Sequence, residues 1–224
     1  MKLSVIVPML NEAQALPGLL ERLSPLLRNG TEVILSDGES DDGSAEIAER
    51  AGFTVVRAPR GRARQMNAGA AQATGDVLLF LHADTQLPDA AERAITQALE
   101  NSNRVWGRFD VRIHGRSPLL RVVGSLMNVR SRLTGIATGD QAMFVTRTAF
   151  DAVGGFPDQP LMEDIELSSR LLKHSRPACI ATRVTTSGRR WETRGVWRTV
   201  LLMWRLRWNY WRGVPAQQLA NAYR

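Results

Sequence analysis

The chain has 224 residues, of which 44% are hydrophobic and 23% are charged. That length and balance exclude a disordered or fibrous chain and allow a sizeable core, in one domain or one domain with a small appendage. The formal net charge of +7 favours an anionic partner such as a nucleotide, a membrane lipid or a nucleic acid. The single cysteine, Cys179, excludes an internal disulfide framework and a zinc–cysteine cluster, and it fits a reducing cytoplasm.

The start of the chain does not resemble a targeting signal. Residues 1–8 are too short for the apolar core of a signal peptide, and the acidic Glu12 follows soon afterwards. No uninterrupted apolar stretch approaches the roughly 20 residues that a membrane-spanning helix needs. We therefore expect a cytoplasmic protein that is either soluble or peripheral at the inner face of the membrane.

The first hundred residues alternate between short apolar strands and helical patterns. The expected strands are 3–7, 32–36, 53–57 and 77–81, and the expected helices start near 11, 41, 62 and 88. The links between these segments are short. Four such alternations predict an α/β fold with a doubly wound, mostly parallel sheet.

Two of these strands lead into an aspartate. Asp37 follows the second strand, and Asp84 follows the fourth, an apolar run that is typical of a strand buried on both faces. Connections of one hand bring Pro8, Asp37 and Asp84 to the same edge of the sheet, where α/β folds bind ligands. Asp84 is therefore the first candidate for a metal-binding or phosphate-linked role. The alternative is that Asp84 caps a turn or the helix near Pro88.

The phosphate-binding motifs of two common nucleotide folds are missing. The turn from Pro8 to Glu12 holds no glycine, so a dinucleotide-binding turn cannot form there, and no Walker-type Gly-Lys-Ser/Thr occurs. Phosphates must then be held by a metal, by arginines or by helix ends. Arg60, Arg62 and Arg64 crowd the start of one expected helix, which suits a diphosphate, with a solvated basic turn as the alternative.

The second half of the chain is less regular. We expect strands near 105–113, 138–145 and 178–185, helices over 119–133 and from 163 onward, and a loop at 150–156. Gly139 allows a close backbone approach to a ligand. Glu163 and Asp164 begin a helix, where acids stabilise the helix dipole. Glu166 adds a third acid two residues further on, and three acids within four residues repel one another and are more than a helix cap needs.

Residues 196–212 combine tryptophan with arginine. Five of the six tryptophans lie between Trp191 and Trp211, and the chain from Arg189 onward has eight arginines and one acid, Glu192. A helix here places two sets of side chains on different faces, one with Val200, Trp204, Trp208 and Trp211 and one with Arg198, Arg205, Asn209 and Arg212. Such a helix can lie in a membrane interface beside anionic lipid. The alternatives are packing on the domain and a dimer contact.

Five motifs occur in order along nearly the whole chain. They are Ser-Val-Ile-Val-Pro at 4–8 with Asn11-Glu12, Asp37-Gly38 with 40–44, Asn67-Ala68-Gly69 with 73–76, His82-Ala83-Asp84, and Gly154-Gly155-Phe156 with Glu163-Asp164. In this order and spacing they resemble family 2 of the inverting glycosyltransferases with the GT-A fold. Residues 61–67 and the ending from Arg190 resemble a small stand-alone bacterial subfamily. Some of its members are labelled arsenosugar-biosynthesis or selenium-domain-associated transferases.

The resemblance implies an enzyme that moves a sugar from a nucleoside-diphosphate sugar to an acceptor hydroxyl. It implies that Asp84 coordinates Mg²⁺ or Mn²⁺ on the diphosphate and that Asp164 is the general base, with Glu163 as the next candidate. The expected substrate-binding residues are Pro8, Leu10, Glu12, Asp37, Arg62, Arg64, Asn67, His82, Gly139, Asp140, Arg190 and Trp191.

Two positions depart from the family's pattern. The first acid of the metal motif is His82 here, which leaves open whether this residue contacts the ribose or the metal. The arginine that is usual before Asn67 is Met66, so diphosphate contact passes to Arg62 or Arg64. Retention by double displacement would need a nucleophile beneath the sugar, and the sequence offers no independent candidate.

We expect a transferase domain over 1–190, with a nucleotide-sugar half at 1–103 and an acceptor half at 104–190, and a basic helical appendage at 191–224. The acceptor is unidentified, and a lipid-linked one is compatible with membrane contact by the appendage. A sugar nucleotidyltransferase is an alternative, but it would need a glycine-rich loop after the first strand. A non-catalytic module that binds membrane or nucleic acid is another. Nucleic acid is disfavoured because acids at a binding site repel the phosphate backbone.

Overall fold

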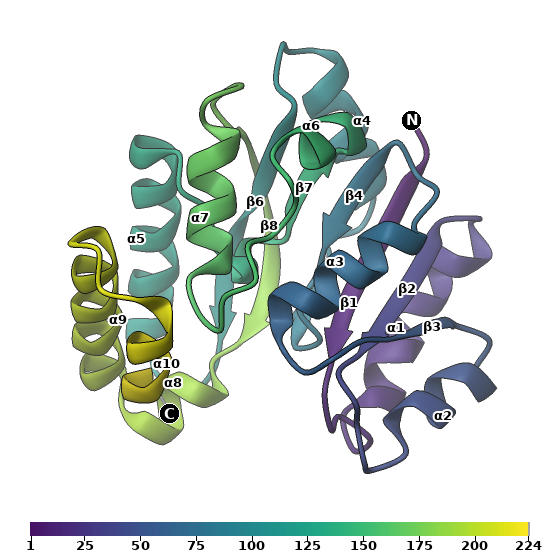
Figure 1. Cartoon of the computed structure of the whole chain (residues 1–224), viewed down its shortest axis with the longest axis horizontal. Helices are drawn as coiled ribbons and strands as arrows, with labels where there is room; N and C mark the ends of the chain where they lie inside the picture. Colours follow the sequence, from purple (N-terminus) through teal and green to yellow (C-terminus); the bar gives the residue numbers. More distant parts are fainter. Residues whose placement is uncertain (224) are drawn as a thin grey trace.

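The computed structural model describes residues 1–223. Over this range the strands form one eight-stranded sheet in the order β3-β2-β1-β4-β7-β6-β8-β5 (Figure 1). The predicted α/β class with a doubly wound sheet is confirmed. The sheet is parallel through its first four strands and mixed beyond β4.

The first half of the chain has the predicted alternation. Its strands are β1 (Leu3–Met9), β2 (Glu32–Asp37), β3 (Thr54–Arg57) and β4 (Val77–Phe80), and its helices are α1 (Leu16–Arg28), α2 (Ser44–Arg50), α3 (Arg62–Gln72) and α4 (Ala91–Glu100). Strand β1 pairs in parallel with β2 and β4, and its last residue, Met9, lies opposite Asp37. The carboxyl ends of β1, β2 and β4 therefore meet at one edge of the sheet.

Strand direction changes at β7 (Met143–Thr146). It runs antiparallel to β4 and to β6 (Trp106–His114), and β6 pairs in parallel with β8 (Ala178–Ser187). The two-residue strand β5 (Thr85–Gln86) pairs with the end of β8, where Thr85 lies opposite Thr186. This pairing brings the segment after β4 next to the carboxyl end of β8.

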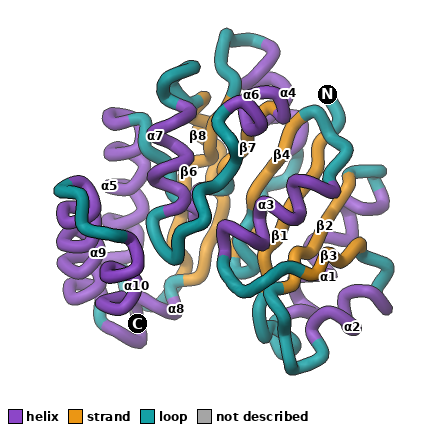
Figure 2. Tube along the Cα trace, in the orientation of Figure 1, coloured by secondary structure: helices purple, strands orange, loops and turns teal. Residues whose placement is uncertain are grey.

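Helices cover both faces of the sheet (Figure 2). Successive residues of β1 serve the two faces, because strand side chains alternate: Val5 and Val7 join one core cluster and Ile6 joins the other. Helices α1, α2 and α4 pack on the first face. Helices α3, α6 (Arg147–Ala152) and α7 (Glu163–Leu171) pack on the second. Helix α5 (Leu119–Thr134) packs along β6, with Met127 against the first cluster.

Several short elements lie outside the pattern that the sequence predicts. They are β5, the 3₁₀ turn η1 (Gly139–Gln141), α6, α8 (Arg189–Arg194) and α10 (Ala216–Tyr223). The expected loop at 150–156 is wrong at its start, because α6 extends to Ala152 before the turn at Gly154 and Gly155. A side-chain cap starts α6, since the Thr146 hydroxyl accepts a hydrogen bond from the Ala149 N–H at 3.4 Å.

The last helices pack against the domain. Leu206 of α9 (Val196–Trp211) is buried with Met162, just before α7, and with Leu219 of α10. Tyr210 of α9 donates a hydrogen bond to Glu166 of α7 at 3.3 Å. One side of α9 is thus bound to the domain, which matches the packing alternative. Within residues 1–223, no helix has the length and hydrophobicity that crossing a membrane requires.

Candidate functional site

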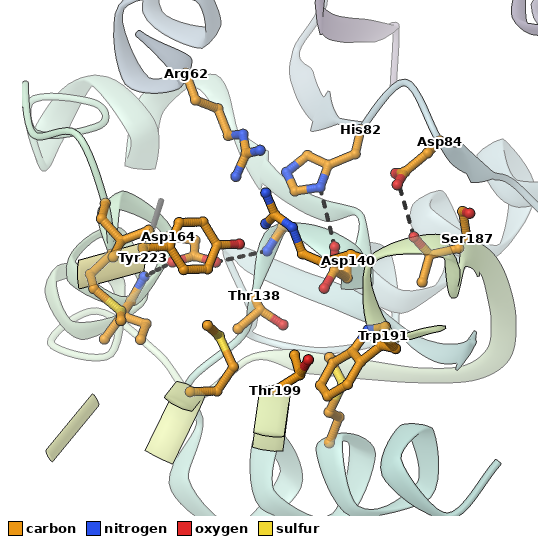
Figure 3. A pocket seen from close by; sticks show the side chains of 18 of the residues that line it. Arg62, His82, Asp84, Thr138, Asp140, Asp164, Ser187, Trp191, Thr199 and Tyr223 are labelled. Carbon is orange, nitrogen blue, oxygen red and sulfur yellow. Dashed lines mark hydrogen bonds and ion pairs between the residues drawn. The ribbon is translucent and has the colours of Figure 1, made fainter. Parts of the chain in front are cut away.

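A cavity of about 1680 Å³ opens at the carboxyl edge of the sheet and extends between α5 and α9 (Figure 3). Its walls come from the end of β1 and the segment after it, the segment after β4, η1, and helices α3, α5, α7, α8, α9 and α10. Twelve of the fifteen predicted site residues line it: Pro8, Leu10, Glu12, Arg62, His82, Asp84, Gly139, Asp140, Glu163, Asp164, Arg190 and Trp191. Residues far apart in the sequence therefore share one site.

Asp84 presents its carboxylate to this cavity. Its Oδ1 atom accepts long hydrogen bonds from the hydroxyls of Thr85 at 3.4 Å and Thr186 at 3.5 Å, which anchor it to the β5–β8 pair. Strand β4 ends at Phe80, so Asp84 lies beyond the strand rather than at its end. Helix α4 has no side-chain cap and begins at Ala91, so the alternative that Asp84 caps this helix is wrong.

His82 and Asp140 are in direct contact on the wall of the cavity. The His82 Nδ1 atom lies 3.3 Å from Asp140 Oδ1 (Figure 3). Burial would raise the pKa of Asp140, but the hydrogen bond from His82 and the charges of His82, Arg62 and Arg190 together lower it. Asp140 is therefore ionised, and it neutralises part of the positive charge contributed by the two arginines.

Glu163 lies behind Asp164 at the start of α7. Its side chain is 5% exposed, and its Oε1 atom lies 3.6 Å from Arg62 Nη1. Burial raises the pKa of Glu163, the neighbouring charge of Asp164 raises it further, and Arg62 opposes both effects. Glu163 thus lies behind Arg62 at the cavity wall, and the contact with Arg62 only partly offsets the effect of burial on its pKa.

Asp164 is fixed by two backbone N–H groups. Its Oδ2 atom accepts a hydrogen bond from Gly139 N at 2.9 Å, and its Oδ1 atom accepts one from Ile165 N at 2.7 Å. The carboxylate is partly exposed and lines the cavity (Figure 3). The third acid of the segment, Glu166, points elsewhere and binds Arg170 at 3.0 Å and Tyr210. Of the three acids in this segment, Glu163 and Asp164 thus line the cavity, and Glu166 helps to hold α9 against the domain.

Glu12 adds negative charge near Asp84. Burial raises the pKa of Glu12, and the carboxylates of Asp84 and Asp42 raise it further, while Arg189 lowers it. Two carboxylates at one end of the cavity, together with the arginines of α3 and α8, give the site both signs of charge. Such a site suits a diphosphate that carries a cation.

Three predicted residues do not line the cavity. Arg64 turns to the surface and forms a two-pronged ion pair with Asp158, at 2.7 and 3.0 Å. Asn67 is used structurally, since its side chain accepts a hydrogen bond from Phe156 N and donates one to Phe156 O. Asp37 is buried at the end of β2, where Oδ2 accepts a hydrogen bond from Ser40 N at 3.0 Å and Oδ1 has no partner among the described residues.

Sequence reasoning missed several cavity residues. Gln65 crosses beneath the site and donates to Met9 O at 2.6 Å and Ser36 O at 2.9 Å. Tyr223 comes from α10, and the guanidinium of Arg190 lies 4.5 Å from the centre of its ring. Arg130 of α5 lines the cavity with Nε and Nη2 buried and without hydrogen-bond partners in the described chain. No local pattern marks these residues, because each reaches the site only through tertiary packing.

The sequence matches the model of a known family. The sequence model of Glycosyl transferase family 2 matches residues 4–152, which is more than half of the chain. The chain belongs to glycosyl transferase family 2. The family's match covers β1 to α6 and so includes Asp84, His82 and Asp140 but not Asp164.

Relatives of this family 2 protein have similar sequences over part of the chain. It is 32% identical over 152 residues to an undecaprenyl-phosphate 4-deoxy-4-formamido-L-arabinose transferase of Yersinia enterocolitica, which covers 62% of this chain and 46% of the relative. It is also 32% identical over 169 residues to the protein of the same name from Pseudomonas fluorescens, covering 67% of this chain and 48% of the relative. The chain thus spans about half the length of these relatives.

Solved structures share the fold at low sequence identity. Residues 1–349 of S. aureus TarS, in complex with UDP-GlcNAc, align with a TM-score of 0.67 and 17% identity, over 84% of this chain and 58% of TarS. The mannosyltransferase PcManGT of Pyrobaculum calidifontis, in complex with GDP-Man and Mn²⁺, aligns with a TM-score of 0.62 and 21% identity, over 82% of this chain and 56% of that one. Both alignments support the GT-A fold.

Proposed function

We propose that this family 2 member transfers a sugar from a nucleoside-diphosphate sugar to an acceptor hydroxyl, with inversion at the anomeric carbon. The observation that carries the proposal is the cavity that joins Asp84, the His82–Asp140 pair, Arg62, Arg190 and Asp164. Two fold relatives are described with a nucleotide sugar bound, UDP-GlcNAc in one and GDP-Man in the other. The donor class is carried over from them.

The donor would occupy the end of the cavity near β1 and β4. Asp37 does not line the cavity, and its proposed contact with the nucleoside is supported by its buried Oδ1 atom, which has no hydrogen-bond partner among the described residues. Pro8, Leu10 and Glu12 border the cavity beside it. Arg62 and Arg190 offer guanidinium groups to the diphosphate, since arginine binds phosphate through paired N–H donors.

A divalent cation fits these residues together with the donor. Among residues 1–223, no group of three or more His, Cys, Asp or Glu side chains could hold a metal. Mg²⁺ and Mn²⁺ sites on nucleotides are commonly built from one or two carboxylates plus phosphate oxygens, and Asp84 offers a carboxylate of this kind. A bound cation would neutralise the charge that develops on the leaving diphosphate. Mn²⁺ is named with PcManGT, and the choice between Mg²⁺ and Mn²⁺ is open.

Asp164 is the proposed general base. The acceptor oxygen forms a bond to the anomeric carbon while the bond from that carbon to the diphosphate oxygen breaks. The hydroxyl proton passes to the Asp164 carboxylate, and the electron pair leaves with the diphosphate. Hydrogen bonds from Gly139 and Ile165 support this role because they orient the carboxylate. A single base is enough for inversion.

The acceptor would lie on the side of the cavity formed by α5 and α9. That side is lined by apolar residues, including Leu126, Leu133, Met203 and Trp204. The name of the two relatives, undecaprenyl-phosphate 4-deoxy-4-formamido-L-arabinose transferase, contains a lipid phosphate, an apolar chain with a phosphate head. A lipid-linked acceptor is therefore part of the proposal.

A thermal-shift screen of nucleoside diphosphates and their sugars, with and without Mn²⁺, tests the donor class. A donor at about 100 times its dissociation constant adds about 2.7 kcal/mol, which raises the melting temperature by about 5–10 °C. We expect that shift for one base, with Mn²⁺ present. Equal melting temperatures across the whole panel would contradict the proposal.

A further inference from the structure

Nearly all the large exposed apolar side chains of the described chain lie on two helices. Nine of the eleven belong to α5 or α9: Val122, Leu126, Val129, Leu133, Trp197, Leu201, Trp204, Trp208 and Trp211. Exposed apolar residues scattered singly are normal, but a concentration of this kind marks an interaction surface. We name these nine residues the apolar face.

Each helix contributes one continuous stripe. The α5 residues are spaced by four, three and four positions, and the α9 residues by four, three, four and three, which keeps each set on one side of its helix. The sequence pattern places Val200 on this stripe, but the exposed residues are Trp197 and Leu201 instead. The stripe is rotated because Leu206 is the residue that packs into the domain. The stripe on α5 has no counterpart in the sequence-based expectation.

The two stripes border the same cavity. Leu126, Val129 and Leu133 of α5 and three tryptophans of α9 are both exposed and part of its lining. Figure 1 shows α5 and α9 together at one end of the molecule, away from α1 and α2. The apolar face therefore surrounds the outer mouth of the cavity that contains Asp84 and Asp164.

The charge on these helices selects the partner. Helices α5 and α9 together hold six arginines and no acid. Arg121, Arg198 and Arg205 are exposed and form no ion pair within residues 1–223. Tryptophan and arginine around an apolar centre match the interfacial layer of a bilayer with anionic lipids. A second copy of this face would bring like charges together, which disfavours a dimer.

We propose that α5 and α9 together dock the protein on an anionic lipid bilayer, with the mouth of the cavity against the membrane. The surface goes beyond the proposed transfer reaction, because docking requires neither donor nor metal. It also provides a route for the acceptor of that reaction, since an acceptor embedded in the bilayer can enter the cavity between α5 and α9 without crossing water.

Sedimentation with vesicles tests the docking directly. The full chain should bind vesicles of phosphatidylcholine with phosphatidylglycerol and bind pure phosphatidylcholine at least about tenfold more weakly. Raising the salt to about 1 M, where the Debye length falls to about 3 Å, should release much of the bound protein. A shift of tryptophan emission to shorter wavelength should accompany binding. A chain that stays in solution with phosphatidylglycerol vesicles at low salt would overturn the proposal.

Variants separate the two-helix surface from docking by α9 alone. The pair Val122→Gln with Leu126→Gln should weaken vesicle binding about tenfold, as should Trp197→Gln with Leu201→Gln. Leu126→Met preserves the apolar character and should bind like the wild type. If the α5 pair does not fold, Leu133→Gln replaces it, because that side chain is 73% exposed. Unchanged binding by a folded α5 variant would overturn the joint role of the helices.

Charge variants and solution mass complete the test. Arg198→Gln on α9 should weaken binding to anionic vesicles, whereas Arg28→Gln, an equal change of charge at the exposed end of α1, should not. Equal losses of vesicle binding in the two variants would indicate a general effect of net charge and would contradict docking through α5 and α9. Sedimentation equilibrium should give a monomer without vesicles. A dimer that the tryptophan variants dissociate would show that a second copy occupies this face instead.

Discussion

Gly139 and His82 are packed so closely that a β-carbon on Gly139 would overlap the imidazole ring. The same short turn donates a hydrogen bond from Gly139 N to Asp164. Gly139 therefore contacts both His82 and Asp164, two side chains that line the cavity. The sequence suggests a close approach of the backbone to a ligand at Gly139, and the neighbour in the structure is a side chain.

Gly139→Ala should displace His82 and loosen its contact with Asp140. We expect weaker donor binding, by about tenfold for the loss of one charged contact, with a smaller effect on the melting temperature. Calorimetric titration of the donor measures the first effect and thermal melting the second. A variant that binds donor like the wild type would show that the position of His82 is unimportant for the donor.

Asp164→Asn should stop transfer while leaving donor binding nearly intact. The amide keeps the shape of the carboxylate but cannot accept the proton of the hydroxyl, and general-base catalysis is worth about 100-fold to 10,000-fold. Turnover measured beside donor affinity separates the two effects. Normal turnover would move the base elsewhere, with Glu163 the first candidate.

Arg130→Met should weaken use of an anionic acceptor. The Nε and Nη2 atoms of Arg130 have no hydrogen-bond partners in the described chain, and the residue lines the cavity on α5. A hydrogen bond to a charged group contributes about 1.5–3 kcal/mol, so we expect kcat/KM for such an acceptor to fall about 10-fold to 100-fold. Donor affinity should be unchanged. A loss confined to donor affinity would place Arg130 at the diphosphate.

Glu163→Gln should change how stability depends on pH. Folding raises the pKa of Glu163 above its ordinary value of 4.5. Between pH 4.5 and the raised pKa, Glu163 therefore keeps its proton in the folded protein and loses it in the unfolded chain. This group's contribution to stability is therefore fully present below pH 4.5 and is lost as the pH rises through the raised pKa. The variant should gain stability relative to the wild type as the pH rises above 4.5.

Chemical unfolding at several pH values measures that difference, with Glu21→Gln on the exposed face of α1 as the control. The free energy of unfolding of this control should depend on pH in the same way as that of the wild type. If Glu163→Gln destabilises the protein increasingly as the pH rises, the ion pair with Arg62 outweighs burial, and the pKa of Glu163 is lowered by folding rather than raised.

The parallel half of the sheet was predictable because its strands are continuous apolar runs with short helical connections. The same regularity brought Pro8 and Asp84 to one edge. What the sequence could not provide was the direction of side chains. Arg62 and Arg64 are about 200° apart around α3, so one faces the cavity while the other meets Asp158. Placement of Arg130 and Tyr223 depends on how distant helices pack, which no local pattern encodes.

Binding of the nucleoside diphosphate by the wild type and by Asp84→Asn, with and without Mn²⁺, tests the central claim most directly. Calorimetric titration should give tight binding to the wild type only with Mn²⁺. Asp84→Asn should lose this metal-dependent binding while its melting temperature without ligand stays close to that of the wild type, because Asp84 is exposed and makes only long hydrogen bonds. Equal Mn²⁺-dependent affinity in both proteins would contradict a metal-linked donor site at Asp84.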